Sequence, residues 1–380
     1  MTTSNKKILV FTGGGPAPAL NATIAGIIIE ARKLGFKVLG GIAGWACIAK
    51  EGGRIVDLDS LDIDPERISK IGSTLLATSR TNPFKIESGV ERIRKYLKEN
   101  EIDGVVAIGG DDTLGAASRL FGDFRLPIVG VPKTIDNDLD CTYWTPGFPT
   151  ATLRLIQFTK AVTQVARATG RIHVIECFGG KAGWLTACAY LGGAKVIVVP
   201  EVITPVEKLI DRIRSLNKED SYVVVAVSHT AKFNPEFHGV LAGKKDTFGH
   251  QREYLVCVNL VKCIALAVGD VDIKLEIPSY YLMGADPIEV DRKVAIDLGR
   301  QAVKLINNGR FGYMSAVDDS RGVQTIPLAE AVGKYHGLDD EWFDFEGFIP
   351  KEKFMKYIRD ILASEIGKID LDYKPFRFFI

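Results

Sequence analysis

Short apolar runs that stop at glycine or proline recur through the first half of the chain, and helix-like segments separate them. Residues 7–12, 104–108 and 126–131 are such runs, and their unbroken apolar character is typical of strands buried on both faces of a parallel sheet. Residues 21–34 and 87–99 have the apolar period of helices. This alternation predicts an α/β fold with doubly wound parallel sheets.

A second α/β unit follows the first, without an internal repeat or a long linker. We expect helices over 152–169, 184–191 and 205–216, strands over 173–177, 195–199 and 222–227, and closing helices over 292–307 and 351–366. The Gly- and Lys-rich stretch 231–247 is expected to be a mobile loop. Open parallel sheets bind ligands at the carboxyl ends of their strands, so we expect a site in the cleft between two interleaved domains.

Composition narrows the function. The chain has 380 residues, enough for two domains, and its net charge of +1 excludes long-range attraction to nucleic acid or to an anionic membrane. Its six scattered cysteines lack the spacing of a zinc site, and no apolar run reaches the ~18 residues of a membrane span. We therefore expect a cytoplasmic protein with reduced thiols, no nucleic-acid or membrane partner, and an anion site that is purely local.

Three turns at the ends of the strand-like runs carry the polar chemistry. The first, at residues 12–21, places Gly13, Gly14 and Gly15 between a strand and a helix. Glycines there let backbone N–H groups approach an anion at the positive end of the helix, although a tight turn with a structural role alone has the same sequence. The spacing is neither G-x-G-x-x-G nor GxxxxGK[ST], which counts against a dinucleotide fold and a P-loop.

The second turn follows the run at 104–108 and consists of Gly109, Gly110, Asp111, Asp112 and Thr113. Two carboxylates beside a phosphate loop would repel an anion unless a divalent cation binds with it. An aspartate that only caps the next helix is the alternative.

The third turn, at residues 132–138, places Lys133, Thr134, Asp136 and Asp138 after the run at 126–131. Phosphoryl transfer needs a base for the acceptor hydroxyl and cations that spread the charge of the transferring group, and this turn offers both. A solvated Asx-rich turn is the alternative, but three such turns on successive strand ends favour a shared site.

In this order and spacing, the three turns resemble those of the phosphofructokinase family, which has a glycine loop, G-G-D-x-[ST] and then T-I-D-N-D. Residues 72–80, ending in Arg80, resemble the family's donor-site segment, and residues 145–151 resemble its G-[FY]-x-T-A helix start. The resemblance covers roughly residues 5–320 and is most specific in the first 150. It implies a phosphofructokinase-like fold with the active site in the inter-domain cleft.

The resemblance also implies roles for individual residues. Asp136 is implied as the general base on the acceptor hydroxyl, while Thr134 and Asp138 contact the acceptor or the transferring phosphoryl group. Asp111 is implied as the protein ligand of a Mg²⁺ cofactor. The implied donor-binding residues are Gly14, Gly15, Arg80, Gly110, Asp111, Asp112, Thr113 and Lys133. The implied acceptor-binding residues are Arg171, Phe178, Gly179, Lys181, His229 and Arg292.

Two positions favour pyrophosphate over ATP as the donor. Asp112 and Lys133 stand where ATP-using members of the family have glycine, and with residues 13–18 and 246–250 they resemble the pyrophosphate-dependent branch. A carboxylate where an α-phosphate would lie places like charges together, which costs several kcal/mol, whereas a two-phosphate donor ends before that point. Ala25 replaces an arginine of allosteric members, which predicts an enzyme without that regulation.

The acceptor side departs from the family at three positions. Gly180 stands where the family has the arginine of M-G-R, His229 follows a strand where the family has an acidic residue, and Met283 replaces an arginine that grips the sugar phosphate. Methionine cannot donate a hydrogen bond to a phosphate. Unless Lys181 or Arg252 substitutes, these changes predict weak use of fructose 6-phosphate and better use of another sugar phosphate, a sugar or a polyol.

The predicted function is reversible, Mg²⁺-dependent transfer of a phosphoryl group from pyrophosphate to a sugar-phosphate hydroxyl, of the type that converts fructose 6-phosphate to fructose 1,6-bisphosphate in glycolysis. Alternatives are the same donor with another acceptor, or an ATP-dependent 6-phosphofructokinase. A non-catalytic regulatory subunit is disfavoured because Asp111, Asp136 and Asp138 are all present. A relative of the diacylglycerol or NAD kinases would share the second turn and lack the third.

The resemblance further implies a homodimer or homotetramer whose subunit has two domains. We expect residues 1–145 with about 275–305 to form the larger, donor-binding domain, and residues 146–274 with about 306–325 to form the smaller, acceptor-binding domain. Residues 326–380 are rich in aromatic side chains and are expected to pack on the core or on a neighbouring subunit.

Overall fold

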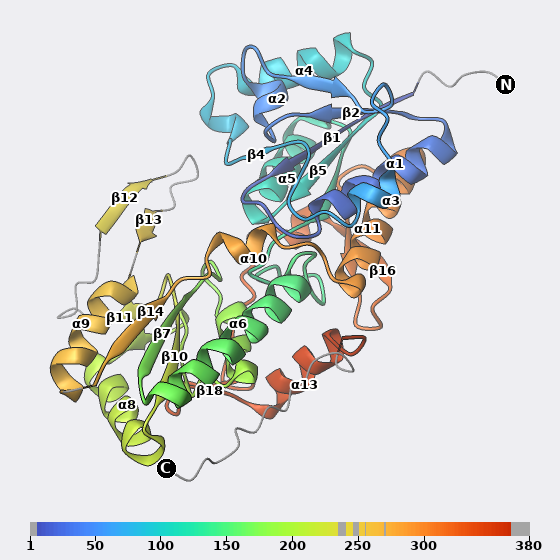
Figure 1. Ribbon diagram of the computed structural model, residues 1–380. Helices are drawn as coiled ribbons and strands as arrows, with labels where there is room; N and C mark the ends of the chain where they lie inside the picture. The colour runs from blue at the N-terminus through green and yellow to red at the C-terminus, as the bar shows by residue number, and fades with distance from the viewer. Residues whose placement is uncertain (1–5, 235–240, 246–250, 255, 270, 366–380) are drawn as a thin grey trace.

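The computed structural model describes residues 6–234, 241–245, 251–254, 256–269 and 271–365. Figure 1 shows two α/β domains, one built on an eight-stranded sheet and the other on a four-stranded sheet. The chain leaves the larger domain after β6 (Ile128–Pro132), builds the smaller domain, and returns at α11 (Glu289–Asn307). Most neighbouring strands of both sheets are parallel, which confirms the predicted α/β class.

The larger sheet has the strand order β16-β15-β6-β5-β1-β2-β3, and β4 pairs with the end of β1. Its neighbours are parallel except for the pairs β2–β3 and β15–β16. Besides β6, the strands are β1 (Lys7–Gly13), β2 (Lys37–Gly41), β3 (Ile55–Asp57), β4 (Thr78–Ser79), β5 (Gly104–Gly109), β15 (Tyr313–Val317) and β16 (Val323–Pro327).

Alternate side chains of the central strands face two separate cores, as a parallel sheet buried on both faces requires. Ile8 and Val10 of β1 join the core under α1 (Leu20–Leu34) and α11, whereas Leu9 and Phe11 join the core of the opposite layer. That layer consists of α2 (Ala46–Ala49), α4 (Gly89–Glu99), α5 (Asp111–Phe124) and α12 (Leu328–Ala331). The short α3 (Pro65–Ile68) lies beside α1, and a 3₁₀ turn, Pro83–Lys85, precedes α4.

α1 and α11 lie backbone to backbone on their shared face of the sheet. A Cβ added at Gly26 would lie 2.1 Å from the carbonyl oxygen of Ile296, and one added at Gly299 would lie 2.3 Å from that of Thr23. Glycine at both positions therefore permits an approach that a larger residue would force apart. The contact ties the first helix of the chain to a helix that follows the smaller domain.

The smaller sheet has the order β14-β7-β10-β8, with all neighbours parallel. Its strands are β7 (Ile172–Cys177), β8 (Val196–Val198), β10 (Val223–Ser228) and β14 (Ile273–Glu276). α6 (Phe148–Thr169) and α7 (Trp184–Ala187) share a core with one face, while α8 (Val206–Asp220) and α9 (Val256–Val268) cover the other. The remaining elements are the 3₁₀ turn Cys188–Gly192, α10 (Tyr280–Gly284), and the strand pairs β9 (Ile203–Thr204) with β11 (Lys232–Phe233) and β12 (Leu241–Lys245) with β13 (Gln251–Tyr254).

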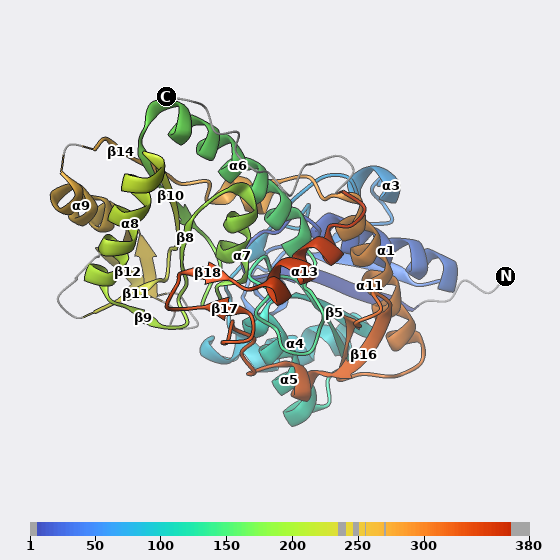
Figure 2. The ribbon, with the colours of Figure 1, turned by 90° about the horizontal axis from the view of Figure 1, so that it is seen from below.

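A C-terminal segment folds back over both domains. It contains β17 (Phe343–Asp344), β18 (Ile349–Pro350) and α13 (Glu352–Ile361). In Figure 2 the red α13 lies between the green α6 and α7 and the brown α11. Phe343 and Phe354 are at most 1% exposed, so within the described residues this segment packs on the core of its own subunit; residues 366–380 lie outside the described part.

Three expectations from the sequence differ from the structure. Residues 306–325 were expected in the smaller domain, but β15 and β16 extend the larger sheet, because the open edge of β6 pairs with β15 at Gly130 and Met314. Conversely, β14 belongs to the smaller sheet although 275–305 was assigned to the larger domain. The stretch 231–247 forms β11 and β12, and its parts 235–240 and 246–247 lie outside the described residues.

None of the helices in the described ranges combines the length and the apolar composition needed to cross a membrane.

Candidate active site

Four loops meet at the carboxyl-terminal edge of the larger sheet, after β1, β4, β5 and β6. They carry Gly14 and Gly15, Arg80, residues 110–113 and residues 133–138, respectively. Because parallel strands place their carboxyl ends at one edge, the structure brings the predicted donor-binding and catalytic residues together.

Glycine allows the loop after β1 and the loop after β5 to approach each other. A Cβ at Gly13 or at Gly109 would lie 2.4 Å from the side chain of Thr113, which is buried between them. Trp45 holds the same threonine by donating from its indole N–H to the threonine carbonyl oxygen at 3.3 Å. Gly110 precedes α5 directly, so the helix begins at the site and directs its first N–H groups toward it.

Lys133 lies beneath the glycine loop and is 4% exposed. Its Nζ donates to the carbonyl oxygen of Gly15 at 2.5 Å and lies 3.3 Å from the place that a Cβ of Gly14 would occupy. Burial lowers the pKa of Lys133 to about 8, against the opposing effect of the nearby Asp136. The lysine is therefore a buried cation that a phosphate on the glycine loop would contact.

Asp136 has a pKa well above that of an ordinary aspartate. Burial raises its pKa to about 7, with a further increase from Asp138, while Lys133 and Arg80 oppose the shift. The backbone N–H of Asp136 donates to Oγ1 of Thr134 at 3.0 Å, which fixes the turn. A carboxyl group whose pKa lies near neutrality is suited to accept a proton from a substrate hydroxyl.

Gly180, from the smaller domain, lies against Asp136. A Cβ at Gly180 would be 2.5 Å from Oδ2 of Asp136, and the glycine has a φ of +56°. Both the close approach and the left-handed backbone exclude other residues here. The two domains thus meet at Asp136, a contact that the sequence did not reveal beyond the two adjacent glycines after β7.

Asp111 and Asp112 occupy the first turn of α5, and both raise the pKa of the neighbouring Asp138, after the larger effect of its burial. Asp111 is exposed and accepts a hydrogen bond from the backbone N–H of Gly333 at 2.8 Å. A hollow of about 310 Å³ adjoins the two carboxylates, with Arg119 over the ring of Phe84 at 4.0 Å in its wall. Asp111 and Asp112 come from the predicted second turn, whereas no motif predicted Arg119 or Phe84 in the wall of this hollow.

The acceptor side is lined by aromatic rings. Phe178 meets His229 at 5.0 Å and Tyr280 at 5.5 Å between ring centroids, both edge to face. Burial lowers the pKa of His229, and the positive charge of Arg80 lowers it further, which favours the neutral histidine. Met283 reaches the glycine loop, with its Cε 2.8 Å from the place of a Cβ on Gly15.

Gly179, Lys181, Arg171 and Arg292 have different surroundings. Gly179 is buried behind Phe178, and Lys181 is exposed beside it. Arg171 precedes β7 at the end opposite the catalytic loops and pairs with Asp272 at 2.9 Å. The guanidinium of Arg292 is held by Glu289 at 3.0 Å and by Glu66 at 3.3 Å. The structure therefore gathers Phe178, Gly179, Lys181 and His229 and engages the two arginines elsewhere.

A buried carboxylate joins the domains behind the site. Asp291 of α11 is 0% exposed and accepts hydrogen bonds from the N–H of Gly147 at 2.9 Å and from the N–H and hydroxyl of Thr150 at 3.3 and 2.5 Å. These donors lie at the start of α6. Its role in this chain is to fix the orientation of α6 against α11.

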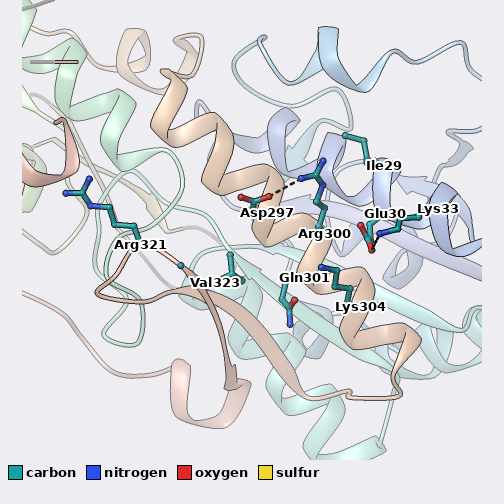
Figure 3. A pocket seen from close by; sticks show the side chains of 10 residues that line it. Ile29, Glu30, Lys33, Asp297, Arg300, Gln301, Lys304, Arg321 and Val323 are labelled. Atoms are coloured by element: carbon teal, nitrogen blue, oxygen red, sulfur yellow. Dashed lines mark hydrogen bonds and ion pairs between the residues drawn. The ribbon is translucent and has the colours of Figure 1, made fainter. Parts of the chain in front are cut away.

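A larger hollow of about 510 Å³ lies away from the catalytic loops, between α1, α11 and the turn before β16. Figure 3 shows its charged side chains in mutual contact: Arg300 pairs with Asp297 at 3.1 Å, and Lys33 lies 3.7 Å from Glu30. Arg321 extends away from the other labelled side chains. These two pairs account for four of the six charged side chains in its lining and do not include Lys304 and Arg321, so the lining keeps an excess of positive charge.

Comparison with known proteins agrees with this geometry. Residues 7–306 match the family model described as Phosphofructokinase. A pyrophosphate–fructose 6-phosphate 1-phosphotransferase from Dictyoglomus thermophilum is 36% identical over 347 residues, which are 90% of this chain and 97% of that protein. An ATP-dependent 6-phosphofructokinase from Mycobacterium bovis is 32% identical over 89% of this chain and 98% of its own length.

The fold has a close counterpart among solved structures. The pyrophosphate-dependent phosphofructokinase of Marinobacter aquaeolei superimposes with a TM-score of 0.81 at 22% identity, covering 94% of this chain and 91% of that one. The similarity extends over both domains.

Proposed function

This chain belongs to the phosphofructokinase family, and we propose that it is an enzyme that transfers a phosphoryl group from pyrophosphate to the 1-hydroxyl of fructose 6-phosphate. The observation that carries the proposal is the cluster of the buried Lys133 with the half-buried Asp136 and Asp138 beside the glycine loop. The name of the relative from Dictyoglomus thermophilum supports the same donor and acceptor.

In the proposed step, Asp136 accepts the proton of the acceptor hydroxyl, and the hydroxyl oxygen attacks the terminal phosphorus of pyrophosphate. The bond from that phosphorus to the bridging oxygen breaks, and orthophosphate leaves. Lys133 and Arg80 spread the negative charge of the transferring group, and Thr134 and Asp138 shape the turn that presents the base. In the reverse direction the same carboxyl group returns the proton, so we propose a reversible reaction.

Pyrophosphate is the proposed donor because of Asp112. This carboxylate lines the hollow beside Asp111, where any donor longer than two phosphates would extend. A nucleotide would bring its own negative charge toward Asp112, whereas pyrophosphate ends at the glycine loop and Lys133.

We propose Mg²⁺ as the cofactor, with Asp111 as its principal protein ligand. Mg²⁺ commonly binds through one or two carboxylates together with substrate phosphates. The described residues contain no group of three or more His, Cys, Asp or Glu side chains that could enclose a metal, which fits an ion that arrives with the donor. Bound there, the ion would neutralise charge on the donor phosphates.

For the acceptor, the structure removes one of the three objections raised by the sequence. Gly180 is required by its contact with Asp136, so its lack of a side chain says nothing about the substrate. We propose that the sugar lies against Phe178 and His229, with Lys181 near its phosphate. Arg292 would have to exchange its partners Glu66 and Glu289 for that phosphate, whereas Arg171 lies at the opposite end of β7 from Phe178.

We further propose a cytoplasmic homodimer or homotetramer without nucleotide regulation. All six cysteines are free, and four of them are buried, as in a reducing compartment. Ala25 is 0% exposed, so an arginine at this position would need a different core.

The test is a panel in which pyrophosphate, ATP and polyphosphate are each offered with Mg²⁺ to fructose 6-phosphate, other sugar phosphates, sugars and polyols, and products are identified by ³¹P NMR. Pyrophosphate with fructose 6-phosphate should react fastest. Asp136→Asn should lower kcat about 10²–10⁴-fold, whereas Asp140→Asn, at an exposed carboxylate of the same loop, should leave it unchanged. Asp112→Gly should raise the rate with ATP relative to pyrophosphate.

Each outcome bears on a different part of the proposal. Faster turnover with ATP in the wild type overturns the donor. Faster turnover of an unphosphorylated sugar or polyol overturns the acceptor. Normal turnover in Asp136→Asn removes Asp136 from the role of base.

A further inference from the structure

The loop that carries the catalytic carboxylates is held from outside by the C-terminal segment. Asn137, between Asp136 and Asp138, is 1% exposed and has a φ of +56°. Asparagine is one of the few non-glycine residues that adopt this left-handed backbone, because its short side chain can form stabilising hydrogen bonds nearby. The direction of both carboxylates therefore depends on what holds Asn137.

Two hydrogen bonds fix the Asn137 side chain. Its Oδ1 accepts from the N–H of Thr145 at 3.1 Å, and its Nδ2 donates to the hydroxyl of Tyr357 at 2.9 Å. That hydroxyl donates in turn to the carbonyl oxygen of Tyr143 at 2.5 Å. Both the donor and an acceptor position of the hydroxyl are used, so it has a single orientation.

The tyrosine is itself immobilised. Tyr357 is 5% exposed in α13, and its ring packs edge to face against Tyr143, Trp184 and Trp342 at centroid distances of 5.2 to 5.6 Å. Burial raises the pKa of Tyr357 well above its usual value, so the hydroxyl keeps its proton across the working pH range.

The same segment touches the site at two further points. The N–H of His336 donates to the carbonyl oxygen of Asp138 at 3.0 Å, and the His336 carbonyl oxygen accepts from the indole of Trp184 at 2.9 Å. Gly333 donates to Asp111. Residues 333–357 thus contact each of the two carboxylate-bearing loops.

We propose that Tyr357 is a positioning residue for phosphoryl transfer: its hydroxyl holds Asn137 in the left-handed backbone and thereby sets the directions of Asp136 and Asp138. The inference rests on the function proposed above. It assigns a role in catalysis to α13, which lies more than 200 positions along the chain from the base.

The test compares Tyr357→Phe with Tyr143→Phe. Both remove one hydroxyl from the same aromatic cluster, but only that of Tyr357 bonds to Asn137. Tyr357→Phe should lower kcat at least about tenfold with little change in KM for pyrophosphate, because a misplaced base affects the chemical step. Tyr357→Phe should also shift the pH at which activity rises on the acid side of the pH–rate profile, because that rise reports the deprotonation of Asp136. Tyr143→Phe should match the wild type in all three.

A second variant separates positioning from stability. Asn137→Gly keeps a residue that favours the left-handed backbone but loses the hydrogen bonds with both Tyr357 and Thr145, and it should lose at least as much activity as Tyr357→Phe. The double variant should be no worse than Asn137→Gly alone, because both changes break one interaction. If Tyr357→Phe does not fold, Asn137→Gly alone carries the kinetic test.

The outcomes also separate this inference from the proposed function. The inference is overturned, and the proposed function stands, if the wild type turns over while Tyr357→Phe keeps the wild-type kcat and the wild-type pH profile below its optimum. Strictly additive losses of kcat in the double variant have the same consequence. If the wild type has no turnover in the donor panel, the titration of the Asp136 carboxyl group, followed by ¹³C NMR, takes the place of kinetics. A shift of the titration midpoint in Tyr357→Phe but not in Tyr143→Phe supports the positioning role. Equal midpoints in the two variants overturn it.

Discussion

Lys133, which is buried, and Asp136, which is half-buried, have opposite charges and pKa values that are shifted toward each other. Burial disfavours the charged form of each, which lowers the pKa of the lysine to about 8 and raises that of the aspartate to about 7. Their mutual attraction opposes both shifts without cancelling them. The two groups are therefore both charged only in a narrow range of pH, and the proposed mechanism requires both charges.

The pH profile follows from these directions. The proposed base, Asp136, works only when it has lost its proton, so kcat/KM for pyrophosphate should rise as the pH passes about 7. Lys133 binds an anion only while it is charged, so kcat/KM should fall above about pH 8. Initial rates from roughly pH 5.5 to 9.5 measure this bell. Lys133→Arg keeps its charge at high pH and should lose the alkaline limb. A flat profile in the wild type contradicts the assignment.

Gly180→Ala tests the contact between the domains at the base. The new Cβ would lie 2.5 Å from Oδ2 of Asp136, so the carboxylate must move, and a displacement of about 1 Å can cost 10²-fold in rate. We expect kcat to fall at least about tenfold. Gly52→Ala is the matched control, since Gly52 also has a positive φ, +68°, but nothing within 4 Å. It should share the backbone cost of about 1–2 kcal/mol and keep full activity.

The sequence could predict the residues of the catalytic loops but not all of their contacts. Asp111, Lys133 and Asp136 follow strands directly, so local order places them at one edge of the sheet. The approach of Gly180 to Asp136 depends on how two domains pack, and no local pattern encodes that. The same holds for Arg292, whose partners Glu66 and Glu289 lie on separate elements.

At the scale of elements, the long periodic segments were predictable and the pairings between distant ones were not. α1, α4, α6 and α11 lie close to their expected ranges, because their apolar period is set locally. β4 has only two residues, too few for a periodic signal. The membership of β15 and β16 in the larger sheet depends on the free edge of β6, which is a property of the assembled sheet.

The crossing of α1 and α11 gives a prediction at this scale. Gly26→Ala would place a Cβ 2.1 Å from the carbonyl oxygen of Ile296, and overpacking of this kind typically costs about 1–3 kcal/mol. Urea unfolding followed by tryptophan fluorescence measures the loss. Gly122→Ala is the control, because Gly122 is exposed in α5 with nothing within 4 Å; it should gain about 0.5–1 kcal/mol from helix propensity. Equal effects of the two changes would contradict the close crossing.

For the whole molecule, the hydrogen bonds of Asp291 link α11 of the larger domain to the start of α6 in the smaller domain. Asp291→Ala would leave three buried donors at the start of α6 without their acceptor, and each unsatisfied group costs about 1–3 kcal/mol. We expect the free energy of unfolding to fall by about 3 kcal/mol or more in the same urea experiment. Asp297→Ala, at an exposed ion pair on the same helix, should change it by less than about 1 kcal/mol. Similar free energies of unfolding for Asp291→Ala and Asp297→Ala would contradict the role of Asp291 in linking the domains.

The position of β15 in the larger sheet has a consequence for synthesis on the ribosome. β6 is complete at Pro132, but its partner begins only at Tyr313, and at about 5–20 residues per second the intervening stretch takes on the order of 10–40 s to make. The sheet of the smaller domain, drawn from residues 172–276, emerges in full during that interval. A nascent chain of this protein therefore carries one finished sheet and one unfinished sheet with an open apolar edge, a natural target for chaperones that bind extended chain.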